Sequence, residues 1–386
     1  MASSSSSSSP GFSIHTLSFP DAPDEPCAVL VDNRVVPHLP VPRSPARPTP
    51  LGEDGTPCFE IRSAGPDKGL GMFATRHIPI GGQILVEHPT ILTPGKVPLP
   101  PEARTAAYRG LSAALPQHRR DGLHAMANCR GPEECTTEEG IAWTNALDLD
   151  LDLPDGIETE AREYGGVFLL LNRANHSCGP NAAHKWDLAS FSTTLYALRP
   201  IAPGEEITII YTDPLQARDK RRAHLFSHYR FMCQCPFCTL PPPLIAESDA
   251  ARADLRDWRH TRPNFPGWAT DLCRADDFVL HSHMEALALI EREGLQGMAS
   301  PFVREVCLCW AMLGEVEQFK EWAEKLERLS DVRDPLMARE VRRWLEDPPL
   351  RLPKWGWRKK QRMQTRKKAA EETPPSPEAY YSPLLF

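Results

Sequence analysis

Three cysteines within six residues place the strongest constraint on how this chain folds. Cys233, Cys235 and Cys238 form a C-x-C-x2-C motif, and closely spaced cysteines of this kind are typical zinc ligands. A structural zinc ion takes four tetrahedral ligands, so the motif lacks one ligand and its sequence neighbours offer none. The fold must therefore bring in a distant ligand. Cys178 is the first candidate, and Cys129 and Cys135 are the alternatives.

Cys178 lies in a stretch that changes abruptly from apolar to polar. The apolar run at 169–171 ends in a cluster of Asn, His, Ser and Cys at 172–178, which Gly179-Pro180-Asn181 follows. This pattern predicts a buried element that enters a tight turn. The polar side chains can hydrogen-bond, bind metal or take part in chemistry. The alternative is a buried histidine beside a cysteine that only fills the core.

Bulk composition excludes several classes of protein. Hydrophobic residues make up 41% of the chain, as in globular proteins, and no apolar run approaches the ~20 residues of a membrane helix. The net charge of −7 argues against direct nucleic-acid binding. The N-terminus lacks the pattern of a secretory signal, so we expect an intracellular protein, in the nucleus, the cytoplasm or both. Its 11 cysteines are then thiols or metal ligands. We also expect a monomer.

Composition and periodicity divide the chain into segments. We expect a disordered region at 1–56, a main domain at 57–212 with a helical insert at about 100–165, a zinc-binding segment at 213–240, a linker at 241–272, a helical domain at 273–347, and a basic and then Pro-containing tail at 348–386. The basic run at 358–368 is interpreted as a nuclear address or a solvated tail. The acidic stretch at 148–163 is a solvated loop or, alternatively, a rim that attracts a basic substrate.

Within the main domain the pattern is largely that of short strands. We expect strands at 58–61 and 207–211, hairpins at 78–86 and 182–198, helices within 101–147, and a basic helix at about 215–229. Glycines at 65, 69 and 71 allow a backbone or a ligand to approach closely. Tyr211 ends the last of these strands.

The order of these features resembles the SET-domain protein-lysine methyltransferases, particularly the SET and MYND subgroup and its fungal relatives. The resemblance is carried by the loop Lys68-Gly-Leu-Gly-Met-Phe-Ala, by Asn175-His-Ser-Cys-Gly-Pro-Asn, by Gly204-Glu-Glu-Ile with Tyr211, and by the cysteine motif. A MYND finger is absent, because residues 75–165 contain only two cysteines. The resemblance implies a mainly β SET fold of small twisted sheets with a pseudoknot, a helical insert, a post-SET zinc site and an α-helical C-terminal domain.

The resemblance also implies roles for individual residues. Tyr211 and Tyr229 match catalytic positions, and Cys178, Cys233, Cys235 and Cys238 match the zinc ligands. The residues that match S-adenosylmethionine-binding positions are Lys68, Gly69, Leu70, Asn145, Asn172, Asn175, His176, Tyr211 and Phe231.

The implied activity is methyl transfer from S-adenosylmethionine to a lysine of a histone or another protein. Such a transfer needs an aligned, neutral amine more than covalent help from the enzyme, and a lysine has an ordinary pKa of about 10.4. A narrow aromatic channel disfavours the ammonium form. The alternatives are a catalytically silent SET scaffold that binds partners through the helical domain, and a chromatin-binding module that uses the basic tail.

Overall fold

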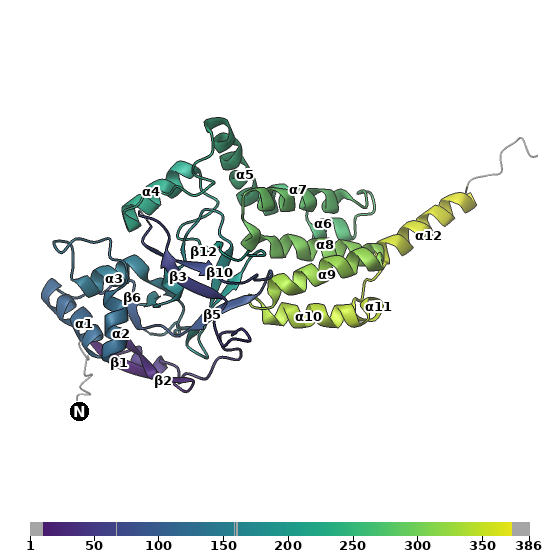
Figure 1. The fold of residues 1–386 in the computed structure, drawn as a ribbon. Coiled ribbons are helices and arrows are strands. Elements are labelled where there is room, and N and C mark those ends of the chain that lie inside the picture. The colour runs from purple at the N-terminus through teal and green to yellow at the C-terminus, as the bar shows by residue number, and fades with distance from the viewer. Residues whose placement is uncertain (1–10, 67, 158, 160, 373–386) are drawn as a thin grey trace, which may run out of the picture. The chain divides into compact units, whose positions relative to one another are not determined.

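The computed structural model describes residues 11–66, 68–157, 159 and 161–372. The chain forms two compact units, Met1–Arg252 and Ala253–Phe386 (Figure 1). The first unit contains all the described strands and the predicted site residues. The second unit is helical. This confirms the expected combination of several small sheets with a helical C-terminal region, whereas the pseudoknot stays an expectation.

The largest sheet has five strands in the order β1-β2-β6-β8-β7. Its strands are β1 (Phe12–Phe19), β2 (Ala22–Asp32), β6 (Ile91–Pro94), β8 (Tyr164–Val167) and β7 (Leu147–Leu149). β2 pairs with β6 in parallel, and the other neighbours are antiparallel. Two strands from the N-terminal region thus build one side of this sheet.

The expectation of disorder at 1–56 was therefore wrong for residues 12–32, and residues 1–10 lie outside the described part. β2 is buried on both faces: Cys27, Val29 and Val31 belong to one core, whereas Ala28 and Leu30 belong to another. A strand that is apolar on both faces shows no alternation. The prolines and acidic residues just before Cys27 further obscured it.

Two smaller sheets complete the strand architecture. One contains β3 (Phe59–Ser63), β4 (Leu70–Ala74), β12 (Glu206–Ile209) and β9 (Asn175–His176), and the other contains β10 (Ala182–Asp187), β11 (Ser192–Ala197) and β5 (Gln83–Glu87). The predicted β10–β11 hairpin is confirmed. The hairpin at 78–86 was wrong, because Ile78 bridges Ile201 and β5 pairs with β11.

Helices cover one face of the five-stranded sheet. They are α1 (Pro101–Ala113), α2 (Gln117–His124) and α3 (Thr137–Asn145), and their apolar residues pack with Ala28 and Leu30 of β2. The helical insert therefore ends at Asn145, earlier than expected, and β7 and β8 follow it. Glu158 and Glu160 of the acidic stretch lie outside the described residues. Further helices of this unit are η1 (Val36–His38), η2 (Leu171–Arg173) and α4 (Arg218–Tyr229).

The expected linker at 241–272 is mostly helical, which corrects that prediction. α5 (Pro242–Thr261) begins at the three prolines and crosses the boundary between the units. Proline is well accommodated in the first turn of a helix, where its missing N–H has no intrahelical partner to lose. The prolines thus start a helix here instead of ending a domain.

The second unit is a series of helices whose neighbours in sequence pack together (Figure 1). They are α6 (Phe265–Ala269), α7 (Phe278–Arg292), η3 (Gln296–Met298), α8 (Ala299–Leu313), α9 (Val316–Ser330), α10 (Pro335–Glu346), α11 (Pro348–Arg351) and α12 (Trp357–Glu372). The expected tail at 348–386 is thus helical up to residue 372, and residues 373–386 lie outside the described part. Arg358 of the basic run is fully buried and pairs with Asp276 at 3.1 Å, so the run is not simply a solvated tail.

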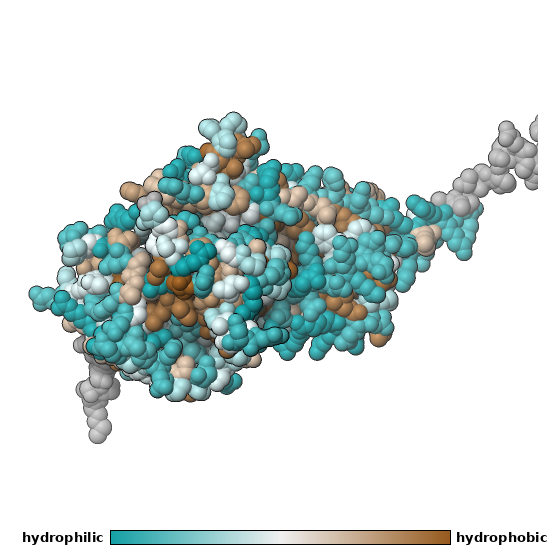
Figure 2. All heavy atoms as spheres, in the orientation of Figure 1, coloured by the Kyte–Doolittle hydropathy of each residue, from teal (hydrophilic) through white to brown (hydrophobic). Residues whose placement is uncertain are grey.

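The face of the molecule in Figure 2 is mostly hydrophilic, with hydrophobic areas between the polar ones. Among the described residues, none of the helices combines the length and hydrophobicity that a transmembrane span requires. Large apolar side chains that stay exposed in the first unit include Leu70, Trp143 and Leu170.

Candidate functional site

Strand β12 brings the predicted site residues together. It pairs antiparallel with β4, where Ile207 lies opposite Met72, and parallel with β9, where Ile209 lies opposite His176. Because β4 follows the glycine loop and Tyr211 follows β12, the sheet places the loop, the Asn175-His176 segment and the tyrosine side by side. Three motifs that are far apart in sequence therefore form one candidate site.

The glycine loop is held against the Asn175 segment by polar contacts. Asn175 donates from Nδ2 to the Leu70 carbonyl at 3.2 Å and to Glu206 Oε1 at 2.9 Å. Lys68 Nζ lies 3.0 Å from Glu206 Oε2. Gly69 has a φ of 68°, which favours glycine. The loop is thus fixed by side chains on two neighbouring strands.

Asn145, at the end of α3, and Asn172, before β9, are joined by a hydrogen bond. Asn172 donates from Nδ2 to the Asn145 carbonyl at 2.7 Å and accepts the Phe168 N–H at 2.6 Å. The Asn145 amide donates to the carbonyls of Ala127 and Ile141 at 2.7 and 2.8 Å. These two asparagines tie the end of α3 to the segment that leads into β9.

Glu87 is an important site-supporting residue that the sequence did not reveal. Its buried carboxylate accepts the N–H groups of Leu169, Leu170 and Leu171 at 2.8, 3.0 and 2.7 Å. Burial raises the pKa of Glu87, while these N–H groups and Arg119 act in the opposite direction. The one available signal was an acidic residue directly after the short apolar run at 84–86. Glu87 thus fixes the backbone just before Asn172.

An aromatic cluster surrounds the end of β12. The Tyr211 hydroxyl donates to the Ala174 carbonyl at 2.7 Å, and the Tyr229 ring centroid lies 5.1 Å from that of Tyr211. Phe231 lies 6.4 Å from Tyr229 and 6.2 Å from His176. Burial, with smaller effects of Tyr229 and Glu206, raises the pKa of Tyr211 well above its usual value. Tyr211 therefore presents a neutral hydroxyl beside aromatic rings.

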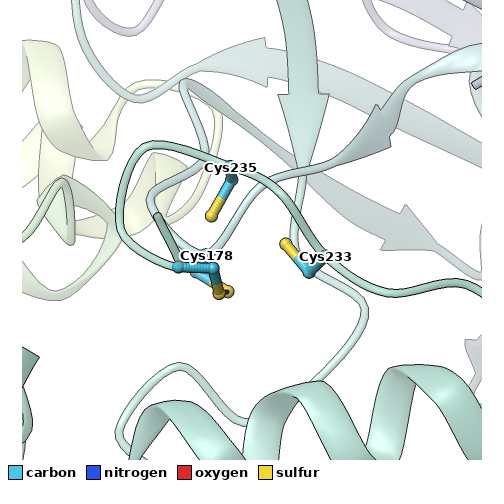
Figure 3. Close-up of side chains that lie close together, drawn as sticks. Cys178, Cys233 and Cys235 are labelled. Atoms are coloured by element: carbon cyan, nitrogen blue, oxygen red, sulfur yellow. Dashed lines mark hydrogen bonds between the residues drawn. The ribbon is translucent and has the colours of Figure 1, made fainter. Parts of the chain in front are cut away.

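The four predicted zinc ligands converge from two segments. The sulfurs of Cys178, Cys233, Cys235 and Cys238 all lie within 4.8 Å of one another, and Figure 3 shows the three labelled side chains directed toward a common centre. Cys178 Sγ and Cys238 Sγ are 3.6 Å apart. Tetrahedral zinc with Zn–S bonds of about 2.3 Å places its sulfurs about 3.8 Å apart. The donor set therefore fits a structural zinc ion.

The alternative fourth ligands lie elsewhere. Cys129 Sγ contacts Thr144 Oγ1 at 3.3 Å and the His228 carbonyl at 3.5 Å, and Cys135 is not in the cluster. Within the described part of the chain, the four-cysteine group is the one set of His, Cys, Asp and Glu side chains that could hold a metal ion. The geometry therefore selects Cys178 among the three candidates.

His176 connects the cysteine cluster to the aromatic cluster. Its Nδ1 accepts the Tyr211 N–H at 3.1 Å, and its Nε2 lies 3.3 Å from Cys178 Sγ. Burial is the main cause that lowers the pKa of His176 to about 4, so the ring is neutral near pH 7. Because Nδ1 accepts, Nε2 carries the hydrogen and donates toward sulfur.

Comparison with known proteins places a SET domain at residues 69–212. The histone-lysine N-methyltransferase set5 of Schizosaccharomyces pombe is 32% identical over 197 residues, which cover 51% of this chain and 56% of that protein. The human protein-lysine N-trimethyltransferase SMYD5 is 40% identical over 115 residues, covering 29% of this chain and 26% of that protein. A SET and MYND domain-containing protein of Dictyostelium discoideum is 40% identical over 102 residues, covering 25% and 29%.

These similarities cover the region that contains the candidate site. The chain spans about half the length of the fission yeast relative and under a third of the other two. The sequence-based recognition of a SET domain related to fungal Set5 and SMYD5 is confirmed. The roles of individual residues stay predictions.

Proposed function

We propose that this chain transfers a methyl group from S-adenosylmethionine to a lysine of a protein substrate. Its SET domain is homologous to those of fungal Set5 and SMYD5 protein-lysine methyltransferases. The homologues support lysine methylation as the reaction class. The observation that carries the proposal is the placement of Tyr211, whose hydroxyl is held on the Ala174 carbonyl between the Asn175-His176 segment and Tyr229.

The glycine loop and the Asn175 segment are the proposed binding site for the methyl donor. When bound, S-adenosylmethionine supplies an electrophilic methyl group on a positively charged sulfur. Lys68, Gly69 and Leu70 offer backbone groups on a loop fixed by Asn175 and Glu206. The side-chain NH2 groups of Asn145 and Asn175 and the His176 ring are already engaged within the protein. We therefore expect these residues to bind the donor mainly through main-chain atoms and to shape the pocket.

The aromatic cluster is the proposed channel for the substrate lysine. Tyr211 and Tyr229 would enclose the side chain, exclude water and orient the amine, so that the reacting atoms are aligned. Burial beside aromatic rings disfavours the charged ammonium. Tyr211 does not act as a general base in this account, because its raised pKa keeps its hydroxyl protonated. Phe231 would cover the donor's adenine.

The substrate is proposed to be a basic peptide of a histone or another protein. Asp148, Asp150 and Asp155 are exposed after the helical insert, where their charges can attract lysine and arginine side chains. The acidic residues alone do not distinguish an enzyme from a silent scaffold. Only observed methyl transfer does so.

The test is to incubate the full chain with isotopically labelled S-adenosylmethionine and with either purified core histones or a desalted cell extract. Calorimetry with the donor alone measures binding separately from transfer. The proposal predicts donor binding together with label on a lysine, identified by mass spectrometry. Donor binding without label on any protein would favour the scaffold, and an absence of binding would contradict the assigned donor site.

A further inference from the structure

We infer that two buried arginines, Arg221 on α4 and Arg252 on α5, complete the zinc site by balancing its charge and clamping the segments that supply its ligands. The inference concerns the metal site itself and does not depend on methyl transfer.

The charge of the cysteine cluster requires such partners. Four thiolates around one Zn²⁺ carry two negative charges that the metal does not cancel. Cys178, Cys233 and Cys238 are buried and Cys235 is partly buried, so water screens this charge poorly. A buried charge is costly unless it is paired and hydrogen-bonded. Nearby cations are therefore expected, and the structure places two fully buried guanidinium groups beside the cluster.

Arg221 faces the sulfurs directly. Its side chain has no exposed surface, and its Nη1 donates to the Gln216 carbonyl and lies 3.8 Å from Asp249 Oδ1. Its Nε and Nη2 are buried without a hydrogen bond of standard geometry. The guanidinium also interacts with the sulfurs of Cys178 and Cys238. The guanidinium thus directs unused N–H groups at two of the four ligands.

Arg252 acts on the backbone of the same ligand. Its Nη1 donates to the Cys178 carbonyl at 3.1 Å and to the Pro214 carbonyl at 2.6 Å. Its guanidinium carbon lies 5.3 Å from the centre of the Phe237 ring, next to Cys238. Arg252 therefore joins the Cys178 turn, the segment after Tyr211 and the C-x-C-x2-C loop.

Asp249 links the two helices that carry these arginines. Its Oδ1 accepts the Arg218 N–H at 2.7 Å and lies near Arg221. The start of α4 is thereby attached to α5. Neither helix contributes a zinc ligand, yet together they surround the site with donors and positive charge.

The decisive variant is Arg221→Met, which removes the charge while keeping much of the side-chain volume. Arg119→Met is the matched control, because Arg119 is also buried in this unit, has an unpaired Nε, and donates to Glu25 and to the Pro89 carbonyl, away from the four clustered cysteines. Zinc per chain is measured by mass spectrometry of the metal. The rate of zinc release to a chromogenic chelator is measured in the full chain.

We expect Arg221→Met to release zinc about 10- to 100-fold faster than the wild type and to lose thermal stability mainly when chelator is present. Arg252→Met is expected to accelerate release less, because Arg252 donates to the Cys178 carbonyl, whereas Arg221 interacts with the sulfurs themselves. Arg119→Met is expected to lower stability without changing the release rate. Equal release from Arg221→Met and wild type, or equal acceleration by Arg119→Met, would overturn the inference.

Arg221→Lys provides the test if the methionine variant does not fold. An ammonium keeps the charge but cannot present the planar fork of donors to two sulfurs. Zinc release from Arg221→Lys is expected to be faster than from the wild type. A wild-type rate in this variant would contradict the assigned role of the guanidinium.

Discussion

The Nε2 atom of His176 lies 3.3 Å from the sulfur of Cys178, and this contact joins two sites that have different proposed tasks. On its other side, the imidazole accepts the backbone N–H of Tyr211. A metal ligand, the donor-site turn and the end of β12 are therefore linked through one neutral ring. Outer partners of this kind orient metal ligands and are often as important as the ligands themselves. Loss of the metal should consequently weaken binding of the methyl donor.

Replacement of Cys178 tests this coupling. Cys178→Ser removes one of four thiolates, so we expect zinc content to fall and affinity for S-adenosylmethionine to weaken by at least about 10-fold. Metal analysis and calorimetry of the same preparation measure both effects. Cys273→Ser, at an exposed position, is the control and should match the wild type. Unchanged zinc would point to another ligand, and lost zinc with unchanged donor affinity would refute the coupling.

Removal of the Tyr211 hydroxyl tests the proposed lysine channel. Tyr211→Phe should lower kcat by about 100-fold, because the hydroxyl on the Ala174 carbonyl can no longer orient the amine. The lost hydrogen bond should reduce the free energy of unfolding by only about 1 kcal/mol, as measured by denaturant titration. Tyr108→Phe, which alters a buried tyrosine of α1, is the control. Undiminished transfer by Tyr211→Phe would exclude the assigned role.

The pH dependence of transfer tests whether the Tyr211 hydroxyl loses its proton in the range where the enzyme works. Burial disfavours the phenolate and raises the pKa of Tyr211, so its hydroxyl stays neutral beyond the usual tyrosine pKa of about 10. The rate should therefore rise with pH as the lysine amine loses its proton. We expect no decline below about pH 10 that depends on Tyr211. A declining limb that disappears in Tyr211→Phe would show that the hydroxyl does titrate.

Glu87 should position the turn before Asn172 without contacting substrate. In Glu87→Gln, an NH2 group replaces one oxygen that accepts backbone N–H groups of 169–171. We expect a loss of about 1–3 kcal/mol in the free energy of unfolding and weaker donor binding. Glu139→Gln is the matched control, since Glu139 is also buried but pairs with Arg104. Equal losses of donor affinity in both variants would argue against a specific positioning role.

Gly71 tests the close contact between the glycine loop and Asn175. An added Cβ would lie 2.9 Å from Ala64 Cβ, 3.0 Å from Asn175 Nδ2 and 3.1 Å from Glu206 Oε1. Gly71→Ala should therefore displace the Asn175 amide and weaken donor binding by about 10-fold, roughly 1.4 kcal/mol. At Gly156 an added Cβ meets nothing within 4 Å, so Gly156→Ala is the control. Unaltered binding by Gly71→Ala would show that the loop tolerates this displacement.

The fourth cysteine and the β10–β11 hairpin could be predicted from the sequence, because ligand chemistry and residue alternation restrict the possibilities. The ligand count of zinc demanded a fourth residue, and Cys178 is the cysteine that joins the cluster. Alternating residues predicted the β10–β11 hairpin, whose partners are close in sequence. In contrast, β2 pairs with β6 through residues that are far apart in sequence, such as Ala28 and Ile91. Such a pairing leaves no local sequence pattern that could predict it. The same limit hid Glu87, whose partners are backbone groups of residues 169–171. Arg221 and Arg252 were hidden because their partners come together only when the chain folds.

The most direct test of the proposed methyl transfer compares the wild type with Tyr211→Phe at equal, saturating donor concentration. Both proteins receive the same labelled S-adenosylmethionine and the same histones and extract, and lysine methylation is read by mass spectrometry. We predict a methylated lysine with the wild type and about 100-fold less with the variant, although both proteins bind the donor. Donor binding without any methylated lysine, or equal methylation by the two proteins, would contradict this proposal.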